Sequence, residues 1–564
     1  MIFSINKLIV ALTASVLFSG FVLSIEAESI AQSDSALIDG KQRPNILLIV
    51  ADDLGYTDLG VFGSEILTPA IDQLAHEGIQ FTNFYTSPVC SSTRAMLLSG
   101  TDNHVAGLGN MYESLAENQR GKPGYEGYLN FSVVALPELL LDAGYHTYMT
   151  GKWHLGLSSD NSPQARGFEN SFSLLPGGAG HFDSLPLEGP GDAPYREDKE
   201  IIQELPKDFY STKYFTDTLV KYIEANRRDE NPFFAYLAFS APHWPLQAPA
   251  ESIRKQKGRY DEGYDVIYQR RQDKLHELGL ISKDTSDQLR LPGELAWSML
   301  TAENKKIEAK KMEIYAAMVS DIDSELLKLF NYLKSINEYE NTVIIFMSDN
   351  GAEGHDLPAT WEGLNRWVEA CCNNNYENMG KADSYLWYGP NWARVSSGPF
   401  RMFKGYTSEG GMRVPAIIRY PTAIQAGTQN RSVISVMDVM PTLLNIAGIE
   451  HPAPTYKQRR VEPMQGSIIL PLPKERKRSP SSSDRILGWE LFGKKALRRG
   501  DWKIVLEPGP RGNDKWQMYH LASDPGEQND LAQSDAKKLN QLIALWEDYA
   551  KENNIIIPSE TSGY

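Results

Sequence analysis

Cysteine is scarce in this chain of 564 residues, which contains only three, at positions 90, 371 and 372. So few cysteines make a poor disulfide framework, and a small cysteine-rich secreted scaffold is excluded. Cys371 and Cys372 are adjacent, so they either pair with each other or both stay free. Cys90 is then a single thiol, which makes it a candidate functional residue.

Positive charge is also in short supply. The chain has 56 lysines and arginines against 72 aspartates and glutamates, for a net charge of −16. Such a balance argues against a general binder of nucleic acid or of anionic membranes, and we expect no nucleic-acid partner. An anionic substrate would have to be held by a local group of cations.

Long apolar runs are missing after the first thirty residues. The one long run, residues 8–25, follows Lys7 and precedes the small residues Ala27 and Ala31. This pattern is typical of a secretory signal peptide, and an uncleaved N-terminal anchor is the alternative, because the run is nearly long enough to span a bilayer. We therefore expect an exported protein, periplasmic or secreted, with no stable membrane insertion after cleavage.

Apolar, strand-like segments alternate with amphipathic, helix-like segments over most of the chain. The expected strands are residues 44–50, 79–85, 145–149, 232–239 and 341–347, and the expected helices are residues 69–78, 137–143, 211–227, 311–336 and 441–448. This alternation predicts an α/β fold with a large, mostly parallel, doubly wound sheet flanked by helices.

The pattern changes after about residue 450. Short strand-like segments at 486–491, 496–506 and 516–521 precede a helical segment at 537–552, which predicts a small antiparallel sheet with a closing helix. The expected organisation is a signal peptide (1–27), a linker (28–42), a catalytic domain (43–450) and a C-terminal α+β subdomain (451–564).

Four of the expected strands run directly into clusters of polar residues. The clusters are Asp52 with Asp53, Lys152 with His154, His243, and Asp349 with Asn350. Ligands of α/β sheets bind along the carboxyl ends of the strands. One cluster would mean little, because polar loops follow most strands, but four indicate a single site assembled from distant parts of the sequence. His104, His181 and His355 are weaker candidates for its rim.

Two of these clusters resemble a metal site. Asp52, Asp53, Asp349 and Asn350 offer hard oxygen ligands on short side chains, which suit Ca²⁺ or Mg²⁺ better than zinc. The alternative is that some of the acids only cap helices. We expect Arg94, Lys152, His154, His243 and Lys404 around the cation; these groups would repel it unless an anion lay between them, so the pattern favours a phosphoryl or sulfuryl oxyanion.

Cys90 precedes an apolar run that predicts a helix, with Ser91, Ser92 or Thr93 as its cap. A helix N-terminus attracts anions, so Cys90 could be a thiolate nucleophile, or else a small buried thiol. A thiolate beside a hard cation would be unusual, because such a cation prefers an oxygen nucleophile.

These motifs resemble those of the formylglycine-dependent (type I) sulfatases of the alkaline phosphatase superfamily, most closely the bacterial arylsulfatases. The matching stretches are residues 43–55, 90–101, 151–156, 241–245, 348–351 and 409–415. The resemblance implies hydrolysis of a sulfate ester to an alcohol or phenol and inorganic sulfate, with Cys90 oxidised to formylglycine by a maturation enzyme. The family usually has Pro or Ala two residues after the cysteine, where this chain has Ser92.

The resemblance also implies a role for each site residue. The implied ligands of Ca²⁺, or of Mg²⁺, are Asp52, Asp53, Asp349, Asn350 and the modified Cys90. The implied sulfate ligands are Lys152, His243 and Lys404. His243 or Lys404 would protonate the leaving alcohol, and Arg94 and Lys152 would orient the formylglycine hydroxyls. His154 would take the remaining hydroxyl proton, so that sulfate is expelled.

Two alternatives stay open at this point. One is a phosphonate monoester or phosphodiester hydrolase of the same superfamily, and the other is a non-catalytic protein that binds sulfated ligands because Cys90 is not converted. The substrate is also open: Trp361, Trp367, Trp387 and Trp392 either line an aromatic entrance or pack the long segment 354–400.

Overall fold

The computed structural model describes residues 37–38 and 41–560, apart from residues 283–284, 286–287, 289, 292–293, 361–362, 470–484 and 510. The expected signal peptide lies outside the described residues, and so does most of the expected linker. Residues 44–564 form one compact unit, and the boundary near residue 450 stays a prediction. In the part of the chain that the structure describes, no helix is both long and apolar enough to cross a membrane.

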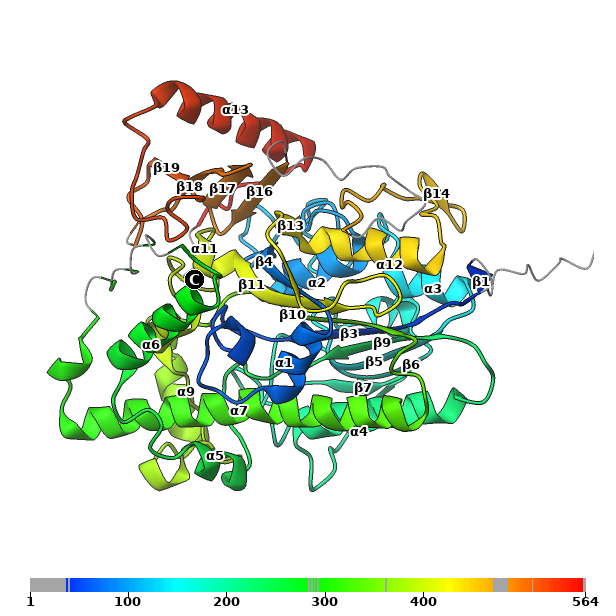
Figure 1. Ribbon diagram of the computed structural model, residues 1–564, viewed down its shortest axis with the longest axis horizontal. Helices are drawn as coiled ribbons and strands as arrows, with labels where there is room; N and C mark the ends of the chain where they lie inside the picture. Colours follow the sequence, from blue (N-terminus) through cyan, green and yellow to red (C-terminus); the bar gives the residue numbers. More distant parts are fainter. Residues whose placement is uncertain are drawn as a thin grey trace, which may run out of the picture. The chain divides into compact units, whose positions relative to one another are not determined.

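A large central sheet organises the compact unit (Figure 1). Its strands are β3 (Asn45–Ala51), β4 (Ile79–Tyr85), β5 (His146–Lys152), β6 (Asn170–Leu174), β7 (Tyr195–Glu197), β8 (Glu200–Ile201), β9 (Phe233–Ala238), β10 (Thr342–Ser348), β11 (Arg413–Arg419), β12 (Thr428–Asn430) and β13 (Ile434–Ser435). The order is β12-β4-β11-β10-β3-β9-β5-β6-β7-β8, with β13 also paired to β4. The middle strands β10, β3, β9, β5 and β6 are parallel, and antiparallel pairs flank them, which confirms the predicted mostly parallel sheet.

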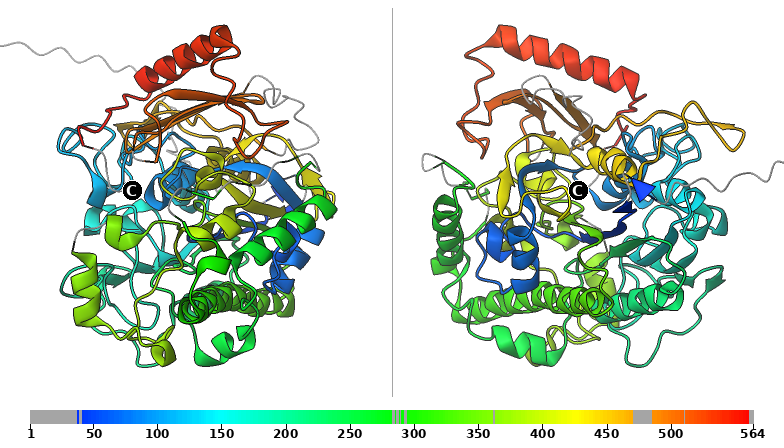
Figure 2. Two further views of the ribbon diagram at one scale, coloured as in Figure 1. Left: turned by 90° about the vertical axis from the view of Figure 1, so that its left-hand side faces the viewer. Right: turned by 45° about the vertical axis from the view of Figure 1, so that its right-hand side comes forward.

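Helices cover both faces of this sheet (Figures 1 and 2). One face packs against α1 (Pro69–His76), α4 (Ser211–Asn226) and α7 (Ala302–Ser335), and the other against α2 (Cys90–Ser99), α3 (Leu136–Asp142) and α12 (Val439–Ala447). In β3, Leu47 and Ile49 join the first core, whereas Leu48 and Val50 join the second. This alternation is why the strand is apolar without interruption.

The long segments between these elements carry shorter helices. They are α5 (Ala250–Gln256), α6 (Tyr264–Glu277), α8 (Leu357–Thr360), α9 (Leu364–Cys371), α10 (Gly389–Ser397) and α11 (Glu409–Met412). Helix α9 ends at an adjacent-residue disulfide between Cys371 and Cys372, and Cys90 is a free, buried cysteine.

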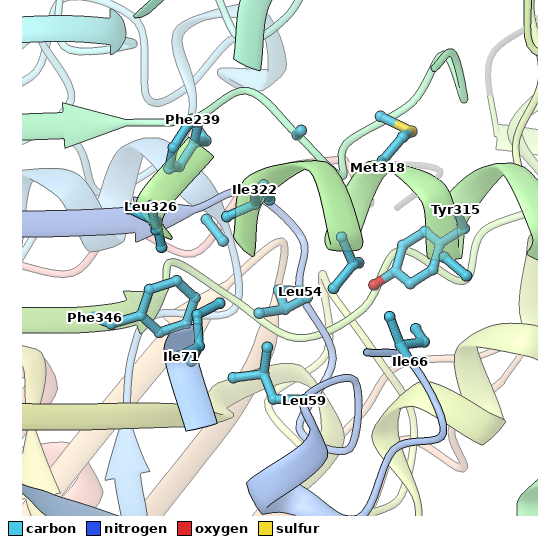
Figure 3. Close-up of a cluster of buried hydrophobic side chains, with 14 of the residues drawn as sticks. Leu54, Leu59, Ile66, Ile71, Phe239, Tyr315, Met318, Ile322, Leu326 and Phe346 are labelled. Carbon is cyan, nitrogen blue, oxygen red and sulfur yellow. The ribbon is translucent and has the colours of Figure 1, made fainter. Parts of the chain in front are cut away.

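Helix α7 is longer than its apolar pattern predicts. It begins at Ala302, capped by the Thr301 hydroxyl, whereas the sequence suggests a start near residue 311. The first two turns are charged and largely exposed, so they carry no apolar periodicity. Further along, Tyr315, Ile322 and Leu326 pack into the core beside the segment that follows β3 (Figure 3).

The C-terminal part forms a four-stranded antiparallel sheet covered by a helix, as predicted in outline. Its elements are β16 (Ile486–Leu491), β17 (Lys494–Arg499), β18 (Trp502–Leu506), β19 (Trp516–His520) and α13 (Ala536–Glu552). The expectation of one strand over 496–506 is wrong: Gly500, at a φ of 58°, turns the chain back and separates β17 from β18.

Candidate active site

Two pairs of acidic and amide residues meet because of the sheet register. Strands β3 and β10 are parallel neighbours with Ala51 opposite Ser348, so the residues that follow them leave the sheet at the same edge. The backbone N–H of Asp53 donates to Asp349 Oδ1 at 3.3 Å. One ligand atom from each of Asp52, Asp53, Asp349 and Cys90 lies within 4.8 Å of the others, and all four residues are buried.

Asn350 completes this oxygen cluster. Its Nδ2 donates to Asp53 Oδ1 at 2.7 Å, and its Oδ1 is buried without a hydrogen-bond partner among the described residues. Asp53 has a φ of 65°, a left-handed backbone conformation that is costly for a residue with a side chain. A buried, unpartnered carbonyl oxygen beside three carboxylates fits a cation ligand.

Each carboxylate of the cluster also has its own buried cation. Lys152 Nζ lies 2.9 and 2.7 Å from the two oxygens of Asp52, and Lys404 Nζ lies 2.9 and 3.0 Å from those of Asp53. Arg94 Nε and Nη2 donate to Asp349 Oδ2 at 3.0 and 2.7 Å. Positive and negative groups therefore alternate, as a site for a cation and an anion requires.

The charged states follow from this pairing. Burial raises the pKa of Asp52, but the attraction of Lys152 and other cations outweighs it and leaves the pKa at about 2. Burial dominates at Asp349, whose pKa is raised. Burial also lowers the pKa of His243, despite the neighbouring Asp53 carboxylate 3.5 Å from its Nε2.

Cys90 is the first residue of α2 and sits 3.9 Å, at Sγ, from Asp53 Oδ1. Burial raises the pKa of its thiol well above the ordinary value, although Lys152 and Lys404 oppose the change. The thiol is therefore protonated near neutral pH.

The predicted helix cap is wrong. Val89 occupies the cap position, and its apolar side chain makes no hydrogen bond to the first turn. The Ser92 hydroxyl donates instead to the Leu108 carbonyl at 2.8 Å, and the Thr93 hydroxyl donates to the Ser87 carbonyl at 3.1 Å. These two hydroxyls tie the helix start to neighbouring loops.

His154 follows β5 and holds a φ of 54°, a second left-handed backbone at the site. Its Nε2 lies 3.0 Å from Glu113 Oε1, and its Nδ1 is buried with no hydrogen-bond partner among the described residues. Glu113 belongs to a short 3-10 helix, η2 (Tyr112–Ser114), far from His154 in the sequence.

A cavity of about 370 Å³ opens onto these residues. Cys90, His154, His243 and Lys404 line it, whereas Arg94 and Lys152 are fully buried behind its wall. The apolar part of the wall includes Leu108, Met111, Leu157, Leu175, Leu187 and Trp244. The structure thus brings the ten predicted catalytic and metal-binding residues to one place, with four of them on the cavity wall.

Sequence reasoning missed two carboxylates of this site. Glu113 contacts His154, and Glu353 Oε2 lies 3.5 Å from Lys404 Nζ. Glu353 also accepts from the backbone of His355, and its three-residue distance from Asn350 could have drawn attention to it. No signal in the sequence marks Glu113. His104, His181 and His355 are not among the residues that line the cavity.

The three described tryptophans of segment 354–400 are not among the residues that line the cavity. Trp392 is fully buried and donates to the Glu308 carbonyl, and Trp367 donates to the Gly189 carbonyl. Trp387 packs in a cluster with Trp244, which does line the cavity. Trp361 lies outside the described residues.

The glycine-rich stretch 409–415 supports the cavity wall. A Cβ at Gly410 would lie 2.2 Å from the Met402 carbonyl oxygen, and one at Gly411 would lie 2.1 Å from that of Tyr406. These glycines therefore allow close packing against the backbone that carries Lys404.

Comparison with known proteins agrees with this geometry. Residues 44–449 match the family model described as Sulfatase, and residues 398–552 match the model described as N-sulphoglucosamine sulphohydrolase, C-terminal. The chain is 44% identical over 530 residues to an uncharacterized sulfatase of Schizosaccharomyces pombe, covering 91% of this chain and 95% of the relative. It is 39% identical over 435 residues to an arylsulfatase of Klebsiella aerogenes, covering 76% and 91%.

A solved structure is also similar. The protein Ps i-CgsB in complex with k-i-k-neocarrahexaose superposes with a TM-score of 0.64 at 25% identity, covering 92% of this chain and 95% of that one. The family model matches most of the chain. The two relatives align with this chain over 95% and 91% of their own length. This chain therefore belongs to the sulfatase family and is a sulfuric ester hydrolase.

Proposed function

We propose that this hydrolase is of the arylsulfatase type: it releases inorganic sulfate from esters of phenols or other largely apolar alcohols, with a nucleophile made from Cys90 and a Ca²⁺ ion at the sheet edge. The observation that carries the proposal is the cluster of Cys90, three carboxylates and three cations beside one mostly apolar cavity. Alternating charges of this kind suit a sulfate group placed between a metal and several cations.

The donor set supports a bound cation. Asp52, Asp53, Asp349 and Asn350 would hold it, together with the oxidised Cys90, and the unpartnered Oδ1 of Asn350 is an observation that favours a ligand there. All-oxygen ligands suit Ca²⁺, and Mg²⁺ is the second choice. When bound, the cation would withdraw negative charge from the sulfate oxygens.

Cys90 is better suited to be a precursor than a nucleophile. Its buried thiol has a raised pKa, so the reactive thiolate is disfavoured. Oxidation by a maturation enzyme to formylglycine, whose hydrate carries hydroxyl groups, would supply the oxygen nucleophile that a hard cation favours. Ser92 departs from the usual Pro or Ala of the family's modification motif, so conversion has to be measured.

The remaining residues divide between two proton transfers and positioning. Lys404 and His243 both flank Asp53 on the cavity wall, so either can protonate the leaving alcohol. His154, on the same wall, would accept the hydroxyl proton when sulfate leaves. Arg94 and Lys152, behind the wall, would orient the nucleophile while they neutralise Asp349 and Asp52.

The cavity wall supports an apolar alcohol that carries no second anionic group. Tyr112 and Leu157 line the cavity with 52% and 48% of their surface exposed, so apolar surface continues outward from the site. Glu188 and Asp192 also line it, and these carboxylates would repel a second sulfate on the substrate.

Mass spectrometry of the Cys90 peptide, from protein made by its native host, tests whether Cys90 is converted to formylglycine. An unmodified thiol would refute the proposed nucleophile.

Sulfate release from nitrophenyl sulfate tests the reaction. In isotopically labelled water the label should appear in sulfate and not in the phenol, because the S–O bond is broken. A faster rate on a phosphate diester or a phosphonate than on the sulfate ester would favour a phosphonate monoester or phosphodiester hydrolase. Saturable binding of a sulfated ligand without sulfate release, unchanged in Cys90→Ala, would favour a non-catalytic binding protein.

We propose that the protein is exported, and the sequence of its N-terminal segment is the only support for this proposal. A charged residue followed by an apolar run and small residues supports cleavage near Ala27 or Ala31. N-terminal sequencing of the mature protein from a periplasmic or culture fraction tests it. An intact segment that starts at Met1 would refute cleavage.

A further inference from the structure

Glu113 and His154 form a carboxylate–imidazole pair on the cavity wall. Glu113 Oε1 lies 3.0 Å from His154 Nε2, and both residues line the cavity next to Cys90, His243 and Lys404. The two residues come from separate elements: His154 follows β5, whereas Glu113 lies in η2. None of the motifs that resemble the sulfatase family includes Glu113.

The hydrogen bond decides which ring nitrogen of His154 carries the proton. An ionised carboxylate can only accept a hydrogen bond, so Nε2 must donate and carry the hydrogen. In a neutral imidazole the other nitrogen then has a free lone pair. That nitrogen, Nδ1, is buried and has no hydrogen-bond partner among the described residues, so it is available to take a proton.

The charge states agree with this arrangement. Desolvation by the surrounding cavity wall raises the pKa of the half-exposed Glu113, but the attraction and hydrogen bond of His154 outweigh it and leave the pKa at about 2. Burial lowers the pKa of His154 in spite of Glu113. Near neutral pH the pair is therefore an ionised carboxylate and a neutral imidazole.

The backbone holds both partners in place. The His154 N–H donates to the Leu175 carbonyl at 3.1 Å, which fixes its left-handed backbone. The η2 turn is held by the buried Asn110, whose Nδ2 donates to the Ser114 carbonyl at 2.8 Å. Gly177 closes over the pair: a Cβ there would lie 2.9 Å from His154 Cε1 and 3.3 Å from Glu113 Oε1. Three chain segments thus meet at one hydrogen bond, with His154 buried and 48% of the Glu113 side chain exposed.

We propose that Glu113 is a positioning residue, which holds His154 in the Nε2–H tautomer so that Nδ1 accepts the hydroxyl proton in the second half of the reaction. This inference rests on the proposed role of His154 as the base. Glu113 itself transfers no proton, because its carboxylate stays ionised. Its effect should therefore fall on kcat, and the KM for the ester should change little.

The test compares Glu113→Gln and Glu113→Asp with the wild-type full-length protein. Glu117→Gln is the matched control, because Glu117 is an exposed carboxylate of the same segment that does not line the cavity. Nitrogen–proton correlation spectra of histidine-labelled protein give the tautomer of His154, assigned by its loss in His154→Gln. This readout does not depend on conversion of Cys90 or on activity.

We expect Glu113→Gln to lower kcat by about tenfold to a hundredfold with an unchanged KM, and to replace the Nε2–H signal with a mixture of tautomers. Glu113→Asp should recover part of the lost kcat and part of the Nε2–H signal. Glu117→Gln should match wild type in both measurements. A wild-type kcat in Glu113→Gln would overturn the proposal, and so would a reduced kcat with an unchanged tautomer. If wild-type protein shows the Nε2–H tautomer but releases no sulfate, the proposed function fails while the positioning of His154 by Glu113 stands.

Discussion

Lys152 Nζ donates to both carboxylate oxygens of Asp52, at 2.9 and 2.7 Å, although β9 lies between β5, which ends at Lys152, and β3, which Asp52 follows. Both side chains are fully buried. The pair therefore neutralises a charge that a bound cation would otherwise have to neutralise alone.

Replacement of Lys152 by Met should make stability depend strongly on metal. The variant keeps the apolar stem but leaves Asp52 beside Asp53 and Asp349 without its main cation. Loss of one partner of a buried pair costs about 3–5 kcal/mol of unfolding free energy, and a bound Ca²⁺ should restore part of it. Thermal unfolding with Ca²⁺ and with a chelator measures the effect.

The matched control is Lys213→Met. Lys213 is an exposed lysine that pairs with Asp217 one turn along α4. Its loss should cost no more than about 0.5 kcal/mol, with no dependence on Ca²⁺. An equal response to Ca²⁺ in both variants would contradict a link between Lys152 and the metal site.

His104 should make stability depend on pH in the alkaline range. Its Nδ1 lies 2.8 Å from Asp102 Oδ1, and its Nε2 lies 3.6 Å from Glu490 Oε2 on β16. Burial lowers the pKa of His104, but the two carboxylates outweigh it and raise the pKa to about 9. Because the folded pKa is the higher one, the contribution is complete below the unfolded pKa of about 6.5 and is lost as pH rises through about 9.

His104→Gln should remove this dependence. As the pH rises from about 6.5 to about 9, wild type should lose about 3 kcal/mol of unfolding free energy, and the variant should lose much less. Urea unfolding at a series of pH values measures it. The control is His520→Gln, at the partly exposed end of β19. A curve for His104→Gln as steep as that of wild type would contradict the buried ion pair.

Gly177→Ala should disturb catalysis without removing any functional group. The added Cβ would lie 2.9 Å from His154 Cε1 and 3.1 Å from its Nε2, so the imidazole must move. We expect kcat for nitrophenyl sulfate to fall about tenfold, since misplaced catalytic groups cost at least that much. By contrast, Gly178→Ala crowds Leu187 on the cavity wall and should mainly raise KM. The same kinetic change in both variants would argue against a specific effect on His154.

Lys503 should be a main support of the contact between α11 and the C-terminal sheet. Its Nζ lies 2.9 Å from Glu409 Oε1 and 2.8 Å from Glu527 Oε1, and all three side chains are fully buried. Lys503→Met leaves two buried carboxylates facing each other and should cost about 3–5 kcal/mol. The double variant with Glu527→Gln should recover part of this loss. Chemical unfolding measures both, and no recovery would contradict repulsion as the cause.

Local patterns predicted most of the elements, because apolar residues buried on both faces of a sheet leave a continuous signal. Strand β3 and helix α4 lie within a residue or two of their expected positions. The start of α7 was missed, since its first turns face water and carry no apolar period. The break between β17 and β18 falls at Arg499, Gly500 and Asp501, a polar turn sequence that interrupts the apolar pattern of 496–506 and is enough to locate the break.

The sequence by itself determined the residue types of the site, because acids, cations and a cysteine beside strand ends are visible without coordinates. Only the tertiary structure decided how they pair. The register of β3 against β10 brings Asp52 and Asp53 to Asp349 and Asn350. Glu113 reaches His154 across 41 residues of chain, through a loop with no periodic signal. Such pairings depend on how distant segments pack, which no local pattern encodes.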